Sequence, residues 1–548
     1  MVVVGAGPAG IVTALELARS GFDVLLLESG QRWHDPEAQR LSDAAEWDHE
    51  RHAEMSMAVR RQVGGTSVIW GGRCVPFDPI DFEARSVVPD ARWPLGYDEL
   101  TPYFQRACDW LMCGRAAFDS SELPQLPPSI VPGLPNGDVR SSSFERWSLP
   151  TNFGREYRRA LDRSRRLRLM IGLTCTRVVV AADGRRVDHL ETRGHDGREI
   201  NVRGKHFVLA AGGLETTRLL LASPRADGPP VGNHSDQLGR WYMGHAEGVI
   251  AKVRFTTPPQ RTIYAYERDV DGVYVRRRFS FSAEAQQRLE LPNIVAWLAN
   301  PALSDPAHGS GVLSFAYLAL ASPLGRVFAS EAQRESLTGK SVPGSPYGPA
   351  EQGSVRAHMR NVIHGAGPAS RFVGEFGAGR FFPRRRRLPG FFVYSPANVY
   401  PLQYHGEHLP RRDSRVTLAA ERDELGMPRL NIDIRFSQAD IDGVVRAHRR
   451  LDEYLRRHSS GSVEFLNGDP ADAVRSTIGG GFHQTGTTRM SERPEDGVLD
   501  PGLAVHGLED LSVVSSSAFP SSGQANSTFM IVVFALRLAD RLRAERGR

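Results

Sequence analysis

Residues 1–10 read MVVVGAGPAG, a hydrophobic run followed by a glycine-rich turn. Val2–Val4 predicts a short buried strand, and the helical spacing of apolar residues over Ile11–Ser20 predicts a helix. Phe22–Leu27 predicts a second strand, which Glu28 ends. The order is strand, GxGxxG, helix, strand, acid. This order is the pattern of a dinucleotide-binding βαβ unit.

Each part of this unit has a physical task. Gly5 permits the tight turn, Gly7 lets the backbone approach a pyrophosphate, and Gly10 lets helix and strand pack closely. The helix N-terminus then turns bare N–H groups toward the phosphates. Glu28 can accept hydrogen bonds from the adenosine ribose. The motif alone leaves flavin and nicotinamide open, but its place at the start of a long chain favours FAD.

Composition excludes several classes of protein. The chain has 548 residues, 41% hydrophobic and 24% charged, so collagen, coiled coil, disorder and a small disulfide scaffold are excluded. The net charge is +5, but only three of the 68 basic residues are lysine, which indicates coding bias rather than a nucleic-acid surface. The run Arg384–Arg387 predicts a solvated loop, with a docking site for an acidic partner as the alternative.

The sequence predicts a soluble, cytoplasmic protein. Its four cysteines form no CxxC pair, so no disulfide framework is expected. The longest apolar run, Phe529–Leu536, is too short to span a bilayer. No basic leader precedes the first strand, although a short native leader before residue 1 stays open.

A second glycine cluster, Gly64–Arg73, predicts backbone held close to a flat or phosphorylated ligand, with a tight structural loop as the alternative. Further along, Leu167–Leu221 holds short strands around a turn at Asp183–Gly184. Phe207–Gly213 then repeats the passage from strand to glycine to helix. This passage is expected to return the chain to the nucleotide sheet.

Residues 241–475 predict an inserted substrate domain. Strand-like stretches occur at Gly248–Phe255 and Gly272–Phe281, and an amphipathic helix is expected over Ala439–His458. Further strands are expected at Arg415–Leu418 and Arg429–Phe436. The Pro/Gly-rich stretch from about residue 322 to 390 predicts mobile loops.

The C-terminal part carries the densest chemistry. His483–Met490 reads HQTGTTRM, and a strand is expected over Leu511–Val514. Asn526–Thr528 are good N-cap types before the apolar helix Phe529–Leu542. A helix N-terminus carries about half a positive charge, so it would stabilise an anionic reduced flavin.

Three sequence blocks, which occur in the same order in both, make the chain resemble the glucose–methanol–choline (GMC) oxidoreductases. Within that family it is most similar to the bacterial sugar-oxidising members. The blocks are Gly5–Glu28, Gly64–Arg73 with Val208–Leu221, and His483–Thr528. The resemblance implies an α/β fold whose Rossmann-type FAD-binding domain combines residues 1–240 and 476–548. A second α+β domain over 241–475, with an antiparallel sheet, would bind the substrate.

The resemblance also implies the catalytic pair. The family's catalytic histidine falls on His483 and its second catalytic position on Asn526. A neutral histidine can take a hydroxyl proton near neutral pH, and asparagine can orient the same oxygen. Similar loops in the family place His408 beside the substrate, and Gln484 is a second substrate contact.

The resemblance implies a set of FAD contacts. FAD is expected to be non-covalent, because Ile69 stands where some members carry the histidine that attaches it. No metal is expected; His245–Glu247 and His405–His408 have suggestive ligand spacing but lack the rest of a metal motif. The expected cofactor contacts are Gly5, Gly7, Pro8, Ala9, Gly10, Glu28, Ser29, Gly65, Thr66, Ser67, Trp70, Gly71, Gly72, Val178, Ala211, Gly212, Ser516, Asn526, Ser527 and Thr528.

The sequence therefore predicts FAD-dependent oxidation of a hydroxyl group on a sugar, aminosugar or glycoside. The electron acceptor is oxygen or another compound. The alternatives are a dehydrogenase of the same fold with a quinone or protein acceptor, and a non-redox FAD-containing lyase. A small-molecule substrate is the expected partner, without nucleic acid or membrane, and the oligomeric state stays open.

Overall fold

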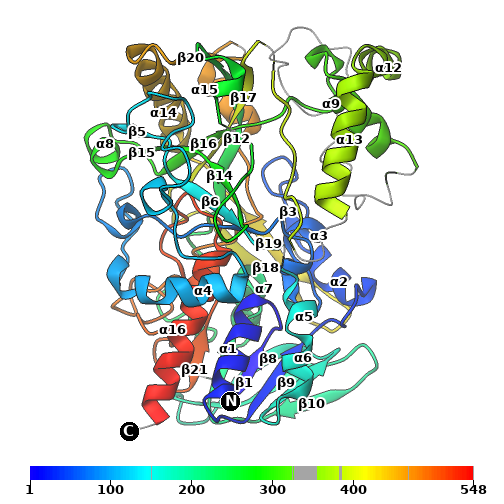
Figure 1. Ribbon diagram of the computed structural model, residues 1–548. Coiled ribbons are helices and arrows are strands. Elements are labelled where there is room, and N and C mark those ends of the chain that lie inside the picture. The colour runs from blue at the N-terminus through cyan, green and yellow to red at the C-terminus, as the bar shows by residue number, and fades with distance from the viewer. Residues whose placement is uncertain are drawn as a thin grey trace.

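A five-stranded parallel sheet occupies the lower part of the molecule, in the order β21-β11-β1-β2-β7 (Figure 1). The computed structural model describes residues 1–546 except 150, 227, 264, 324, 326–353, 382–385, 396 and 467. The expected return of the chain to this sheet is confirmed, because β11 pairs in parallel with β1. The strands are β1 (Val2–Val4), β2 (Val24–Glu28), β7 (Leu167–Ile171), β11 (Phe207–Leu209) and β21 (Leu511–Val513).

The two ends of the chain build this half together. Helix α1 (Pro8–Arg19) follows β1 as predicted, and the C-terminal helix α16 (Thr528–Arg546) packs against it and against α4 (Phe104–Leu111). Figure 1 shows the blue N-terminal and red C-terminal segments side by side. Leu15 of α1 and Val532 of α16 belong to one hydrophobic core, which also holds the five strands. Burial of this shared core joins the first and last parts of the chain.

A small antiparallel sheet flanks the parallel one. It consists of β8 (Thr174–Val180), β9 (Val187–Arg193) and β10 (Glu199–Val202). The predicted turn between β8 and β9 is present, and Gly184 adopts a φ of 71° there, which glycine tolerates best. Helix α7 (Gly213–Leu221) follows β11 and confirms the expected passage from strand to glycine to helix.

The upper part is built on a six-stranded antiparallel sheet in the order β20-β12-β17-β16-β15-β5. Helix α14 (Gln438–Arg457), expected from the sequence, packs with α15 (Pro470–Thr477) on β12 and β20. The Ser437 side chain caps α14 in a capping box with Asp440. The predicted combination of an α/β nucleotide-binding half and a second half with an antiparallel sheet is confirmed. The strands are β5 (Val139–Arg140), β12 (His245–Phe255), β15 (Phe279–Phe281), β16 (Ile294–Leu298), β17 (Val399–Glu407) and β20 (Gly461–Phe465).

The sheets interleave across the predicted domain limits. β5, from before residue 240, pairs with β15, and β6 (Phe144–Trp147) pairs with β14 (Tyr274–Arg277) and β4 (Arg73–Cys74). In the opposite direction, the hairpin of β18 (Arg415–Arg422) and β19 (Pro428–Asp433) pairs with β3 (Glu46–Trp47). The division into 1–240, 241–475 and 476–548 stays a prediction.

Three helices project from the upper part, and the last two correct the expectation of loops in the Pro/Gly-rich stretch. They are α9 (Gly311–Ala321), α12 (Val355–His364) and α13 (Ala366–Phe381). Ser310 and Ser354 cap α9 and α12, and α12 packs on α9. Pro368 falls in the first turn of α13, where a helix tolerates it. The expectation of loops is wrong for 355–381, and much of the remaining stretch lies outside the described residues.

Three further expectations concern basic residues, membrane helices and cysteines. Within the described residues, no helix is long and apolar enough to cross a bilayer. All four cysteines are buried and free. Arg386 is half-buried and donates to the carbonyls of Met112 and Trp147, so this part of the arginine run is not solvated. Arg384 and Arg385 lie outside the described residues.

The remaining short elements are α2 (Pro36–Asp43), α3 (Met55–Ala58), α5 (Phe153–Glu156), α6 (Arg158–Arg163), α8 (Ala283–Arg288) and β13 (Glu267–Arg268).

Candidate active site

A cavity of about 690 Å³ runs from the parallel sheet to the antiparallel sheet. Its lining includes all but three of the predicted site residues. The predicted residues that line it are Gly5, Gly7, Pro8, Ala9, Glu28, Ser29, Gly65, Thr66, Ser67, Trp70, Gly71, Gly72, Ala211, Gly212, His483, Gln484, Ser516, Asn526, Ser527 and Thr528.

At the lower end of the cavity, the two glycine-rich segments touch. Gly5 has a φ of 98°, and a Cβ on Gly65 would lie 2.8 Å from the Cα of Gly7. A Cβ on Gly10 would lie 1.8 Å from the carbonyl oxygen of Gly5. Gly10 therefore supports the turn from behind rather than lining the cavity. The turn leaves the N-terminus of α1 facing the cavity, because Gly7 is its N-cap and Pro8 its first residue.

Glu28 fixes this turn through both carboxylate oxygens. Oε2 accepts the N–H of Ala6 and Oε1 accepts the N–H of Gly30, both at 2.8 Å. Burial raises the pKa of the Glu28 carboxyl, and the hydrogen bonds to backbone N–H groups oppose that rise. A carboxylate oxygen has capacity for more than one donor, so Glu28 can also accept from a ligand in the cavity.

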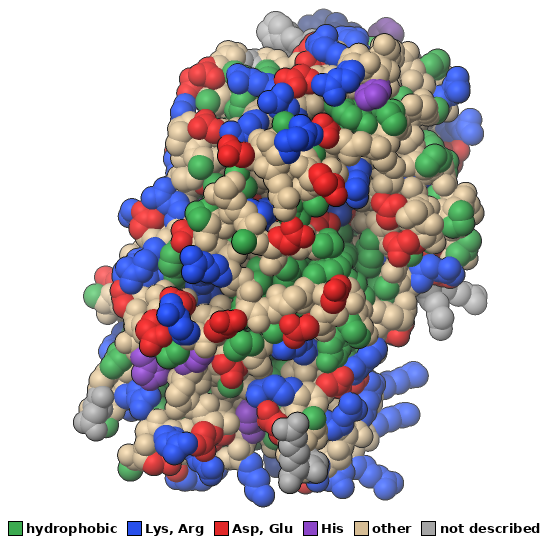
Figure 2. Space-filling model, turned by 90° about the vertical axis from the view of Figure 1, so that its left-hand side faces the viewer, with side chains coloured by type: hydrophobic (Ala, Val, Ile, Leu, Met, Phe, Trp, Pro, Cys, Tyr) green, Lys and Arg blue, Asp and Glu red, His purple; other side chains and the backbone are tan. Residues whose placement is uncertain are grey.

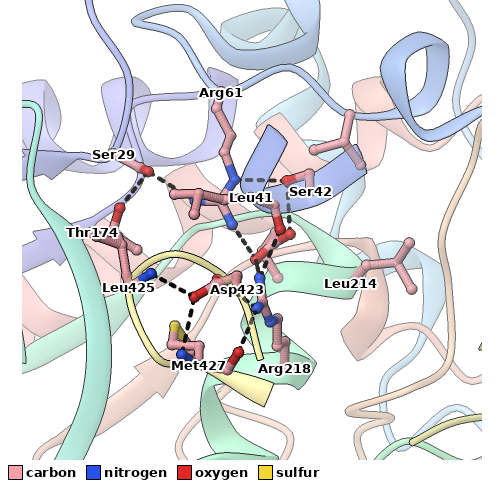
Figure 3. A network of polar contacts seen from close by, with 12 residues as sticks. Ser29, Leu41, Ser42, Arg61, Thr174, Leu214, Arg218, Asp423, Leu425 and Met427 are labelled. Carbon is pink, nitrogen blue, oxygen red and sulfur yellow. Dashed lines mark hydrogen bonds and ion pairs between the residues drawn. The ribbon is translucent and has the colours of Figure 1, made fainter. Parts of the chain in front are cut away.

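A polar network that the sequence did not reveal closes the same end (Figure 3). Arg61 donates to Ser29 Oγ at 2.8 Å and to Ser42 Oγ at 2.6 Å, and it pairs with Glu215. Ser29 also bonds Thr174 at 2.7 Å. These contacts hold the cavity-lining Ser29 in place from two directions. Arg61 is an isolated arginine in the sequence, and no local pattern marks it.

The tip of the β18–β19 hairpin reaches back over the nucleotide half (Figure 3). Asp423 accepts the N–H groups of Leu425 and Met427, at 2.9 and 3.0 Å, and pairs with buried Arg218 of α7 at 2.6 Å. Met427 thereby lines the cavity. A segment from the predicted substrate domain thus covers part of the nucleotide end.

At the upper end, His483 and Asn526 meet. Asn526 Nδ2 lies 2.9 Å from His483 Nε2. An amide NH2 group only donates, so Nε2 is the acceptor and the ring proton sits at Nδ1. Burial, with Arg73 nearby, lowers the pKa of His483 to about 3. The imidazole is therefore neutral at ordinary pH and has a basic nitrogen at the cavity. Asn526 Oδ1 is buried without a hydrogen-bond partner among the described residues.

Two further histidines stand beside this pair. The ring centroids of His245 and His483 lie 4.8 Å apart, and those of His245 and His405 lie 4.1 Å apart. Burial holds the pKa values of His245 and His405 well below the usual range. Glu247 Oε2 lies 3.9 Å from His405 Nε2, and burial raises the Glu247 pKa to about 7. His245 and Glu247 share β12 with only one residue between them, and pairing of β12 with β17 brings His405 alongside.

Aromatic side chains form the wall near His483. Trp147, Tyr266 and Trp297 line the cavity, and the Arg73 guanidinium lies 4.7 Å from the Trp297 ring. Glu145 holds Arg73 at 2.6 Å. These residues come from separate strands and loops, and no spacing in the sequence connects them.

Besides Gly10, two predicted contacts do not reach the cavity. His408 is buried and its ring stacks on Phe436 at 4.1 Å, while Nδ1 accepts the Gly244 N–H and Nε2 lies 2.9 Å from the Arg435 carbonyl. Both ring nitrogens are engaged, so the prediction that His408 contacts substrate does not fit this structure. Val178 is also buried away from the cavity, and its N–H donates to Ser223. The sequence around His408 and Val178 does not indicate that these side chains are buried.

Gln484 lines the cavity, and its contact with a substrate stays a prediction. Its Nε2 donates to the Gly481 carbonyl, and its Oε1 lies 3.4 Å from the Leu214 N–H. These bonds connect the loop of His483 to the start of α7 and fix its backbone.

Comparisons with known proteins agree with this arrangement. A family model described as FAD dependent oxidoreductase matches residues 1–302, and one described as GMC oxidoreductase matches residues 410–535. Paromamine 6'-oxidase of Streptomyces fradiae is 26% identical over 44% of this chain and 52% of its own length. That alignment spans only about half of the paromamine oxidase.

Longer alignments exist. 6'''-Hydroxyparomomycin C oxidase of Streptomyces lividus is 22% identical, covering 100% of this chain and 92% of its own. 2-Methyl-1,2-propanediol dehydrogenase of Mycolicibacterium austroafricanum is 22% identical over 98% and 94%. The solved structure of pyridoxine 4-oxidase from Mesorbium loti shares the fold, with a TM-score of 0.56, 20% identity and 99% of both chains covered.

Proposed function

Because the chain belongs to the GMC family of FAD-dependent oxidoreductases, we propose that it oxidises a hydroxyl group of a sugar, aminosugar or glycoside. The observation that carries the proposal is the contact between His483 Nε2 and Asn526 Nδ2 at the cavity. It supplies a neutral base and a hydrogen-bond donor that meet at one point.

The residues of the cavity fit FAD. A Cβ on Gly65 would lie 2.8 Å from the Cα of Gly7, and one on Gly5 would lie 2.6 Å from the Ala210 carbonyl oxygen, so glycine permits the close approach of these three segments. The N-terminus of α1 offers unpaired N–H groups to a pyrophosphate. Gly7, Gly65 and the N-terminus of α1 would hold the phosphates, and Glu28 the ribose. When bound, FAD accepts a hydride from the carbon that bears the substrate hydroxyl.

The protein's own residues handle the proton. His483 Nε2 takes the hydroxyl proton as the carbonyl forms, so the C–H pair leaves as hydride and the O–H proton goes to the imidazole. Asn526 Nδ2 donates to the same oxygen and fixes its direction. In the free protein, Asn526 holds the base in its acceptor tautomer.

The class of substrate rests on the cavity wall and on the relatives. Trp147 and Trp297 offer flat apolar faces, which suit the C–H faces of a sugar ring. Glu247 adds a hydrogen-bond acceptor for a hydroxyl or ammonium group. Two relatives are named as oxidases of paromamine-type compounds, and both oxidases and dehydrogenases occur among the relatives. We infer oxygen or another compound as electron acceptor, and oxygen consumption during turnover distinguishes the two.

The experiment is an anaerobic visible spectrum of the purified holoprotein with a panel of sugars, aminosugars, glycosides and simple alcohols. Bleaching of the flavin bands by a member of the panel supports the proposal and identifies the substrate. Conversion of a substrate without bleaching would point to lyase chemistry instead. A protein that cannot be reconstituted with FAD would contradict the proposal.

A non-covalent FAD is part of the proposal. Ile69 lines the cavity in the second glycine loop, and its side chain has no nucleophile. Acid precipitation should therefore release the flavin into the supernatant. Flavin that stays with the precipitate would contradict this part alone.

A further inference from the structure

The three projecting helices carry an unusual share of exposed apolar surface. Of the nine large hydrophobic side chains exposed in the described part of the chain, five lie on α9, α12 and α13. They are Phe315, Val355, Met359, Ile363 and Val373. Clustering of this kind marks an interaction surface rather than scattered exposure.

Helix α12 has two distinct faces. Its inner face bonds α9, since His358 Nδ1 lies 3.0 Å from Ser314 Oγ and Asn361 donates to the same oxygen at 3.1 Å. Val355, Met359 and Ile363 follow at intervals of four residues on the outer face, 60%, 46% and 68% exposed. Spacing of four residues places them in one stripe along the helix.

The charges beside this stripe are basic. Arg356 and Arg360 are exposed on α12, and the helix carries no acidic residue. On neighbouring α13, exposed Arg371 pairs with the only acidic residue of that helix, Glu375. An apolar stripe bordered by arginine is the pattern of a helix that lies in the interface of a bilayer with anionic lipids.

The helices are connected to the rim of the cavity. The Leu388 N–H donates to the Gly379 carbonyl in α13 at 3.1 Å, and the next residue, Pro389, lines the cavity. The Phe391 ring packs edge to face against Phe372 and Phe376 of α13, with centroids 5.0 and 5.5 Å apart. Helix α13, which contacts α12, therefore connects these helices to the rim of the substrate end.

We propose that the outer face of α12 binds the surface of a bilayer that contains anionic lipid. The arginines supply the attraction to lipid phosphate, and the apolar stripe enters the acyl boundary. The protein then lies on the membrane without crossing it. This proposal replaces the expectation, drawn from the sequence, that no membrane is a partner. It does not depend on the proposed substrate, because its test measures binding and not turnover.

The test is co-sedimentation of the holoprotein with two kinds of vesicle. One is phosphatidylcholine alone, and the other contains about 30% phosphatidylglycerol, which makes the bilayer surface anionic. The wild type should bind the anionic vesicles, and salt should weaken the binding. Ile363→Glu should weaken it at least ~10-fold by removing apolar contact and adding repulsion. Arg356→Gln and Arg360→Gln should each weaken it about fivefold.

Val270→Glu is the matched control, because Val270 is 59% exposed but lies in the turn between β13 and β14. It should bind like the wild type. The flavin spectrum and melting temperature check that each variant is folded, and the arginine variants remain informative if Ile363→Glu is not.

Three results would overturn the proposal. The first is no binding to anionic vesicles, and the second is an equal loss in Val270→Glu. The third is a wild-type dimer, seen by light scattering without lipid, that Ile363→Glu dissociates. In that case the face is a contact between two copies of the chain.

Discussion

The two ends of the cavity are built in different ways. At the nucleotide end, glycine backbone and a helix N-terminus form the surface, and Glu28 stabilises them through backbone N–H groups. At the substrate end, the surface consists of side chains such as His483 and Trp297, which strand pairing and loops bring together. Added volume should therefore damage the first end, and removed side chains should damage the second.

The largest effect is expected at the substrate end. His483→Ala removes the base, so the rate of flavin reduction in single turnovers should fall at least ~10²-fold. FAD should remain bound, because the nucleotide end is unchanged. Stopped-flow absorbance measures the rate, and the ratio of flavin to protein measures retention. An unchanged rate would remove His483 from the proposed mechanism.

A methyl group at the nucleotide end should produce the opposite pattern. A Cβ at Gly10 would lie 1.8 Å from the Gly5 carbonyl oxygen, so Gly10→Ala must displace the turn. Overpacking of this kind costs about 1–3 kcal/mol. If this strain is present only in the FAD-bound form, FAD affinity should fall roughly 5- to 150-fold. Flavin titration and thermal melting of the apoprotein separate loss of affinity from loss of folding.

Gly71→Ala is the control for this prediction. Gly71 also lines the cavity, but a Cβ added there would have no protein atom within 4 Å. FAD affinity should change by less than in Gly10→Ala. An equal loss in both variants would contradict the argument from backbone contact.

Substitutions of Asn526 test how far catalysis at the substrate end depends on orientation of the substrate oxygen. Asn526→Ala removes one donor to the substrate oxygen and should slow flavin reduction about 10-fold, the value of one hydrogen bond. Asn526→Asp places a carboxylate beside His483, which raises the pKa of the imidazole. The base is active only when neutral. As pH falls, the rate of flavin reduction in Asn526→Asp should therefore begin to drop at a higher pH than in the wild type. A pH profile of flavin reduction identical to that of the wild type would contradict this assignment.

The sequence predicted the nucleotide end well because the information there is contiguous. β1, the glycine turn, α1 and β2 follow each other within 28 residues, and their order fixes their contacts. His483 and Asn526 were identified through the family resemblance, not through spacing. Their contact at 2.9 Å joins two loops that are 43 residues apart.

The remaining residues could not be predicted for a common physical reason. Arg61 and Glu247 each have a partner at the cavity that lies more than 150 residues away, Glu215 and His405. His408 is the reverse case, since the family resemblance placed it beside the substrate but contacts within the protein engage both ring nitrogens. In α12 and α13, caps and aromatic contacts outweigh the glycines that suggested a loop.

Substitution of Glu247 should have the smallest effect on activity, and it tests how the substrate end recognises a charged substrate. Burial raises the pKa of its carboxyl to about 7, so Glu247 is largely protonated at pH 6 and ionised at pH 8. A cationic aminosugar should bind better as the carboxylate forms, so KM should fall a few-fold, about the value of one partly exposed ion pair, as pH rises through 7. A neutral sugar should show no such change. In Glu247→Gln, the KM for both substrates should be flat over this range, with kcat little changed. If the KM of the aminosugar keeps its dependence on pH in Glu247→Gln, another group senses the ammonium, and the substrate end recognises charge elsewhere than on β12.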